Sequence, residues 1–158
     1  MTTERIEVQR TIPAPAEAIF AVLRDPKGHV AIDSSGMLMD SSGEPVKAAG
    51  DSFVVHMDRE ALNDYPMGRY DVVVNITTFE PDHEIAWTVE GQIKPPIGHI
   101  YGYILDPAAG GTLVTSYYDW SSIDPTWRDA GIFPVISEGA LRATLGILER
   151  TVVARSTS

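Results

Sequence analysis

The stretch PVISEGALRATLGILERTVVA, residues 134–154, predicts a long helix around which the rest of the chain is organised. A helix of that length spans about 30 Å, the width of a small domain. Pro134 suits its first turn, where a missing N–H costs nothing. One broad face is expected to pack inward, and it comprises Phe133, Ile136, Ala140, Leu141, Thr144, Ile147, Leu148 and Thr151. Glu138, Arg142 and Glu149 lie on the opposite face, so the helix is amphipathic.

Small side chains occupy the middle of the inward face. Gly139, Ala140, Ala143 and Thr144 stand where a helix that packs only for stability would more often carry leucine or isoleucine. They allow either a close approach of the helix backbone to its neighbours or a hollow beneath the helix. The sequence leaves both interpretations open.

Before this helix, seven stretches have strand character because apolar and polar residues alternate along them. The predicted strands are residues 4–12, 37–40, 51–59, 69–79, 84–92, 99–106 and 112–120. Short helices are predicted at 16–24 and 27–32, and loops at 60–68 and 121–131. Most strands follow one another through turns, which indicates an antiparallel sheet, and helices on one side of such a sheet define an α+β fold.

Length and composition limit the possible functions. The 158 residues, 44% of them apolar, fit one domain with a sizeable core, which we assign to residues 1–158. The net charge of −10 argues against nucleic acids and anionic membranes, because both attract clustered lysine and arginine. Cysteine is absent, which excludes disulfides, thiol catalysis and cysteine-ligated metals. Neither a signal peptide nor a membrane-spanning run is visible, so we predict a cytoplasmic protein without membrane insertion.

Several short motifs occur in an order and spacing typical of one superfamily. They are IPAPAEAIF at 12–20, LRD at 23–25, IAW at 85–87, YGYILDP at 101–107, GGTLVT at 110–115 and LRATL at 141–145. Read together, they resemble the polyketide cyclase/START-like superfamily, also called SRPBCC or helix-grip proteins. The resemblance implies a curved antiparallel sheet of about seven strands wrapped around the long helix. It also implies two short helices after the first strand and an apolar cavity between sheet and helix.

Aromatic and polar residues of the strands, together with residues of the helix, would line that cavity. The candidate ligand-binding residues are Trp87, His99, Tyr101, Tyr103, Tyr118, Phe133, Ile136, Ala140, Ala143 and Ile147. A mainly apolar lining with a few polar groups suits a hydrophobic small molecule. The last strand is ambiguous, and we favour the inward phase that holds Val114, Ser116, Tyr118 and Trp120. A bulge would bring Asp119 inward instead.

Histidine is the residue type most suited to proton transfer near neutral pH. His99 is the best candidate for chemistry, because it opens a strand whose inward phase holds two tyrosines. His56 falls on the polar phase of its strand and His83 in a turn, so both are expected at the surface. His29 and Asp33 could share a hydrogen bond if their segment is helical. No metal site is predicted, because a suitable further set of ligands is missing, and no cofactor is predicted either.

Three functions remain open. The first is binding of a lipid, polyketide-like or aromatic small molecule without covalent chemistry. The second is a cyclase or dehydratase in which His99 and Tyr101 or Tyr103 act as acid and base on a carbonyl substrate. The third is a module that binds another protein through its sheet or a groove. The sequence leaves open whether the protein is a monomer or a homodimer. It lacks the motifs of serine hydrolases, P-loop proteins, zinc proteases and dinucleotide-binding proteins.

Overall fold

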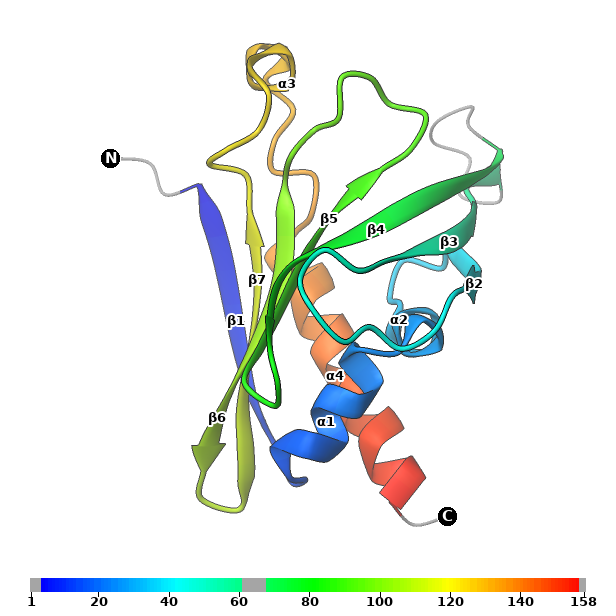
Figure 1. The fold of residues 1–158 in the computed structure, drawn as a ribbon. Helices are drawn as coiled ribbons and strands as arrows, with labels where there is room; N and C mark the ends of the chain where they lie inside the picture. Colours follow the sequence, from blue (N-terminus) through cyan, green and yellow to red (C-terminus); the bar gives the residue numbers. More distant parts are fainter. Residues whose placement is uncertain (1–3, 61–67, 157–158) are drawn as a thin grey trace.

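The computed structural model describes residues 4–60 and 68–156 (Figure 1). The strands are β1 (Arg5–Ile12), β2 (Leu38–Ser42), β3 (Ser52–Asp58), β4 (Arg69–Glu80), β5 (Glu84–Glu90), β6 (Ile100–Ala108) and β7 (Gly111–Asp119). The helices are α1 (Ala16–Leu23), α2 (Pro26–Ile32), α3 (Pro125–Ala130) and α4 (Glu138–Ser156). The predicted α+β fold is confirmed, and every predicted strand and short helix is found within two residues of its expected ends. Most of the loop predicted at 60–68 lies outside the described residues.

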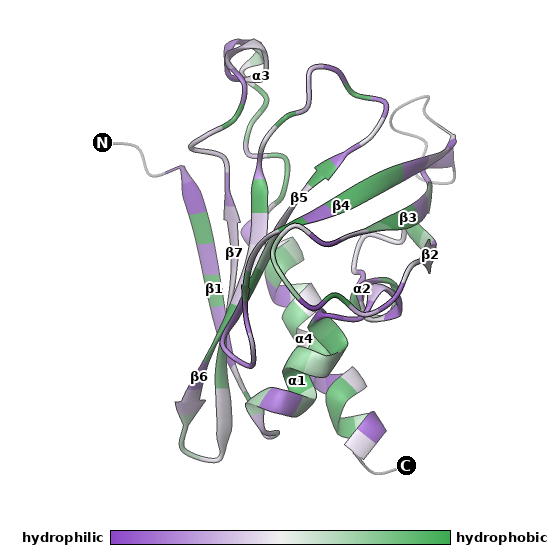
Figure 2. Ribbon diagram, viewed as in Figure 1, coloured by the Kyte–Doolittle hydropathy of each residue, from purple (hydrophilic) through white to green (hydrophobic). Residues whose placement is uncertain are grey.

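The seven strands form one antiparallel sheet in the order β1-β7-β6-β5-β4-β3-β2. Helices α1, α2 and α4 cover one face of this curved sheet, and α4 contacts β1 and β7 (Figure 1). Hydrophobic and hydrophilic residues alternate along β1 (Figure 2), where Val8 and Ile12 are buried while Glu7 and Gln9 are exposed. This period of two gives the sheet one face that packs against the helices and one that meets solvent.

One row of residues crosses the sheet on its inward face. Ile76 of β4 is paired with Trp87 of β5, which is paired with Tyr101 of β6. Tyr101 is in turn paired with Tyr118 of β7, and Tyr118 with Ile6 of β1. Directly opposed residues of antiparallel strands have neighbouring side chains, so this register brings three aromatic rings together beneath the helices.

The inward phase favoured for the last strand is confirmed. Val114, Ser116 and Tyr118 are all buried on the helix side of the sheet. No bulge interrupts the pairing of β7 with β1 or β6, so Asp119 stays on the outer face, where it binds Arg5.

The start of the long helix differs from the prediction. Helix α4 begins at Glu138, and Pro134 lies before it in irregular chain. Ser137 caps the helix: its Oγ accepts a hydrogen bond from the N–H of Ala140 at 3.0 Å, and its carbonyl accepts one from Leu141 at 3.2 Å. A serine that satisfies these free N–H groups sets the first turn. The proline therefore precedes the helix instead of opening it.

The inward face of α4 also differs in part. Its buried residues are Leu141, Leu145, Leu148 and Val152, which follow steps of four, three and four. Ala143 was predicted to face inward but is exposed, because it lies about 200° around the helix from both Leu141 and Leu145. The buried stripe of α4 is thus built from large side chains, and the small residues lie beside it.

Helix α3 was predicted as loop. Asp124 caps it by accepting a hydrogen bond from the N–H of Thr126 at 2.9 Å, and Pro125 occupies the first turn. Gly131 ends it in a left-handed conformation with φ of 69°. An aspartate before a proline, followed by a glycine, is a helix signature that the sequence contained.

Candidate functional site

On the inward face of the sheet, strands β5, β6 and β7 and the residues that flank them carry a set of packed rings, which we call the aromatic cluster. It consists of Trp87, His99, Tyr101, Tyr103, Tyr118 and Trp120. Its rings meet at centroid distances between 5.1 Å (His99 and Tyr101) and 6.0 Å (Trp87 and Tyr101). The strand register therefore brings together five candidate residues from three strands.

Burial differs across the aromatic cluster. Tyr118 is 0% exposed, His99 4% and Tyr103 5%, so this part of the interior is filled by rings. Trp87 and Tyr101 are only half-buried, and their ring planes are 10° apart. Trp87 and Tyr101 are thus the members of the aromatic cluster that reach the surface, and we call this part of it the open end.

A partly open hollow of about 510 Å³ lies on strands β2, β3 and β4. It is lined by Met39, His56, Met57, Asp58, Arg69, Tyr70 and Asp71. None of these lining residues belongs to the aromatic cluster or to α4.

His99 and Tyr118 form the one recorded hydrogen bond between side chains of the aromatic cluster. Nδ1 of His99 lies 2.7 Å from the hydroxyl of Tyr118. The other ring nitrogen, Nε2, is buried without a hydrogen-bond partner among the described residues. Burial lowers the pKa of His99 from 6.5 to about 4, so the imidazole is neutral at neutral pH.

The tyrosines of the aromatic cluster are also neutral. Burial raises the pKa of Tyr101, and the nearby Tyr70 adds a smaller effect in the same direction. Burial likewise raises the pKa of Tyr103 and Tyr118, opposed by hydrogen bonds with Ser116 and with the backbone of Val135, respectively. These phenols can donate or accept hydrogen bonds, but they do not ionise near neutral pH.

The candidate residues on the helical side divide into two groups. Phe133 lies 6.0 Å from His99 between ring centroids, and Ile136 and Ile147 are half-buried against the core. Ala140 is half-buried as well, and its carbonyl accepts hydrogen bonds from Ser34 and Thr144. Ala143 is exposed and does not join the aromatic cluster. Most of the helical contribution therefore comes from the segment before α4.

His29 is an interior residue that the sequence interpretation did not place there. Its ring packs against Trp87 at 4.6 Å and against Phe53 at 5.0 Å. Its Nε2 donates a hydrogen bond to the carbonyl of Leu23 at 2.8 Å, whereas Asp33 binds residues of the following turn. The predicted pairing with Asp33 was therefore wrong. The spacing of buried residues in α2, three apart from Pro26 to His29 to Ile32, could have revealed the inward position.

The remaining histidines lie away from the aromatic cluster. His56 is half-buried, and its ring nitrogens lie 2.8 Å from Ser42 Oγ and 2.8 Å from Asp71 Oδ1. His83 is exposed in the turn between β4 and β5, as predicted. His83, Glu80 and Glu84 each offer one atom of a kind that can bind a metal ion, and these three atoms lie within 4.8 Å of one another. They form the candidate metal-ligating group among the described residues.

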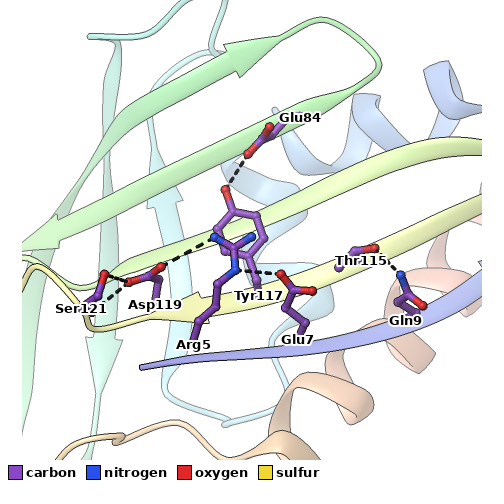
Figure 3. Close-up of polar contacts among 8 residues, drawn as sticks. All are labelled: Arg5, Glu7, Gln9, Glu84, Thr115, Tyr117, Asp119 and Ser121. Atoms are coloured by element: carbon purple, nitrogen blue, oxygen red, sulfur yellow. Dashed lines mark hydrogen bonds and ion pairs between the residues drawn. The ribbon is translucent and has the colours of Figure 1, made fainter. Parts of the chain in front are cut away.

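The outer face of the sheet holds a separate polar network (Figure 3). The guanidinium of Arg5 lies 3.9 Å from the centre of the Tyr117 ring, and Tyr117 donates a hydrogen bond to Glu84 at 2.8 Å. Arg5 also pairs with Glu7 at 2.8 Å and with Asp119 at 3.6 Å. The charged and polar groups of this network are therefore partnered by one another on the outer face of the sheet.

In the part of the chain that the structure describes, no helix combines the length and the apolar character needed to cross a bilayer.

Comparison with known proteins assigns the family. Residues 3–153 match the family described as "Polyketide cyclase / dehydrase and lipid transport", and the chain belongs to it. An uncharacterised protein of Mycobacterium tuberculosis, Rv0088, is 24% identical over 154 residues. That match covers 96% of this chain but 57% of the relative, so this chain spans little more than half of that protein's length.

Solved structures share the fold of this chain. Protein NE0264 from Nitrosomonas europaea has a TM-score of 0.69 over 100% of both chains at 14% identity. The AHSA1-like protein from Aeromonas hydrophila has a TM-score of 0.61 at 20% identity, covering 98% of this chain and 95% of that one. The superfamily resemblance stated from the sequence motifs is confirmed.

Proposed function

We propose that the protein binds a hydrophobic small molecule at the open end of the aromatic cluster, between the sheet and the segment that precedes α4. One observation carries the proposal: Trp87 and Tyr101 present nearly parallel, half-buried rings, whereas the other members of the aromatic cluster are buried. Phe133 and Ile136 supply apolar surface from the opposite side. The family description, which includes lipid transport, supports the same kind of ligand.

The two segments at this end of the fold also support an apolar ligand. The connection between β5 and β6 exposes Ile93 by 40%, and the segment before α4 exposes Ile132 by 56% and Val135 by 47%. Trp127 of α3, the helix before that segment, donates a hydrogen bond to the carbonyl of Pro95 in the β5–β6 connection at 2.8 Å. Figure 1 shows α3 and this connection at the same end of the sheet. Exposed apolar side chains beside half-buried rings are favourable contacts for a hydrophobic guest.

The same geometry gives less support to general acid–base catalysis. A catalytic acid or base works best when its pKa lies near the operating pH. The pKa of His99 is lowered to about 4, and the pKa values of Tyr101 and Tyr103 are raised. These groups are better suited to hold a polar atom of a ligand than to exchange protons with it.

A protein-binding surface is also less well supported. Among the described residues, the large exposed apolar side chains outside the two segments are Met39, Val73 and Val153, which lie on three different elements. Scattered residues of this kind do not form the contiguous patch expected of an interface. The polar network on the outer face is satisfied by its own members.

Titration with the neutral apolar dye Nile red, followed by its fluorescence, tests the proposal. Wild-type protein should bind the dye, and Trp87→Leu and Phe133→Ala should each weaken binding about tenfold, equivalent to about 1.4 kcal/mol. Val73→Ala, which removes an exposed apolar group from the outer face of β4, is the control and should bind as wild type does. Equal binding by all four proteins, or none by the folded wild type, would contradict the proposal.

A further inference from the structure

We propose that the N–H at Nε2 of His99 anchors the ligand, and that the ligand is a neutral molecule carrying a carbonyl oxygen on an apolar skeleton. This inference rests on the proposed function and names the class of ligand for the same site. It starts from the one polar atom of the aromatic cluster that is buried and unpartnered.

The hydrogen bond between His99 and Tyr118 decides which ring nitrogen carries the proton. If the Tyr118 hydroxyl donates to Nδ1, the proton of the neutral ring is at Nε2, and a single donor is left unpaired. In the reverse arrangement, Nδ1 donates to the phenol oxygen. The Tyr118 proton would then have no acceptor recorded among the described residues, and Nε2 would be an unpaired acceptor.

The first arrangement leaves fewer buried groups unsatisfied. Buried donors without partners are costly and rare in native proteins, so the arrangement with one unpaired group is favoured over the arrangement with two. The backbone of Val135, which acts on the Tyr118 oxygen as a hydrogen-bond donor, favours the same choice. His99 therefore presents an N–H to its surroundings, and the complementary ligand atom is an acceptor.

The ring of His99 lies under the side chains through which a ligand would enter. Tyr101 packs against it at 5.1 Å and Phe133 at 6.0 Å, both half-buried and at steep angles to the imidazole. A ligand that parts these two rings reaches the imidazole edge. The unpaired N–H is thus the polar group that such a ligand meets behind an apolar entrance.

The electrostatics of the site favour a neutral ligand. The rings that surround His99 are those of Tyr101, Tyr118 and Phe133, none of which is charged near neutral pH, and burial lowers the pKa of the imidazole itself. The other members of the aromatic cluster, Trp87, Tyr103 and Trp120, carry no charge near neutral pH either. A carboxylate ligand would lose its hydration without meeting a cation, which is unfavourable, whereas a ketone or ester oxygen needs only one donor.

Three probes of similar size separate the possibilities: ethylnaphthalene, acetylnaphthalene and naphthoate. Wild-type protein should bind acetylnaphthalene about tenfold more tightly than ethylnaphthalene, and naphthoate no better than ethylnaphthalene. His99→Phe should remove the preference for the ketone, so that the variant binds acetylnaphthalene and ethylnaphthalene about equally. His83→Phe, an exposed histidine away from the site, is the matched control and should keep the preference.

The outcomes distinguish the carbonyl-anchor inference from the proposed binding function. Binding of ethylnaphthalene without a preference for the ketone, or a preference that survives in His99→Phe, overturns this inference and leaves the proposed function standing. Failure of all three probes to bind overturns the proposed function as well. Tightest binding of naphthoate overturns the neutral-ligand assignment.

Nitrogen NMR of the wild-type imidazoles provides a test that does not depend on a variant folding. We expect His99 to carry its proton at Nε2, and that Nε2–H resonance to shift on addition of acetylnaphthalene while the His83 resonances stay in place. A proton found at Nδ1, or an Nε2–H resonance indifferent to the ketone, would overturn the inference.

Discussion

The ring of Tyr117 lies across Gly102 on the outer face of the sheet, so closely that a β-carbon at position 102 would stand 2.2 Å from Cζ of the tyrosine. Glycine is the residue that allows Tyr117 to cross from β7 over β6 and reach Glu84 on β5 (Figure 3). The contact stabilises the pairing of the strands that also carry the aromatic cluster on the opposite face.

Substituting Gly102 tests this packing. Gly102→Ala should force the Tyr117 ring away and lower the free energy of unfolding by about 1–3 kcal/mol, as other overpacked sites do. Gly146→Ala in α4 is the matched control, because a β-carbon there has no neighbour within 4 Å. It should raise stability by roughly 0.5–1 kcal/mol, since alanine favours the helix. Urea denaturation measures both, and a neutral effect of Gly102→Ala would show that the ring moves freely.

The cap at Ser137 can be tested by its own side chain. Ser137→Ala removes the acceptor for the N–H of Ala140 and should cost about 1 kcal/mol in thermal or urea unfolding. Ser137→Asp restores an acceptor at the positively polarised end of the helix and should recover most of the loss. If alanine and aspartate behave alike, Ser137 does not cap α4.

Because Tyr118 and His99 share a hydrogen bond, substitutions of the two residues should be energetically coupled. Tyr118→Phe leaves Nδ1 of His99 buried without a partner and should lower the unfolding free energy by roughly 1–3 kcal/mol. In the background of His99→Phe the same change should cost less, with a coupling energy of roughly 1 kcal/mol in a double-mutant cycle. Strict additivity of the two substitutions would contradict the bond.

The interior histidines predict how stability depends on pH. For both His29 and His99 the pKa is lowered by burial from 6.5 to about 4; the Leu23 hydrogen bond and Asp25 oppose the shift at His29. The unfolded chain takes up these protons near pH 6.5 and the folded protein only near pH 4. Between these values the unfolded state binds more protons, so stability is complete above pH 6.5 and falls as the pH drops toward 4.

The size of this effect is on the order of 3 kcal/mol for each histidine across that range. His29→Gln keeps a donor for the Leu23 carbonyl but does not titrate, so the variant should lose less stability than wild type between pH 7 and 4.5. Carboxylates titrate equally in both proteins, and the difference between the two urea-denaturation profiles isolates the histidine. Identical profiles would mean that His29 is protonated without penalty.

Periodicity was sufficient to predict most of the fold. Alternation along the strands and the chain order gave the antiparallel sheet and the terminal helix, and the inward phase of Tyr101 and Tyr118 followed from the same pattern. Alternation does not locate helix ends, which depend on local capping: Ser137 sets the start of α4, and Asp124 with Gly131 bounds α3. The prediction that Ala143 faces inward was wrong, because the predicted inward face was wider than the stripe of buried residues that Leu141, Leu145 and Leu148 define.

The polar details of the site depend on contacts between distant parts of the chain. The bond between His99 and Tyr118 requires the pairing of β6 with β7, which places Ile100 opposite Asp119. The inward position of His29 depends on how α2 packs over β5 and β3, where Trp87 and Phe53 meet it. Local sequence does not encode such distances, so the candidate residues could be named but the unpaired nitrogen could not.

The place of β1 beside β7 has a consequence for how the chain acquires its shape. Gln9 reaches Thr115, 106 residues further along the chain, with a hydrogen bond of 3.1 Å, and among the described strands β7 is the sheet neighbour of β1. During synthesis β1 cannot pair with β7 until β7 has been made, while β2 to β6 can already form hairpins with their sequence neighbours. Long-range pairings of this kind form slowly, so β1 is expected to join the sheet after those hairpins have formed.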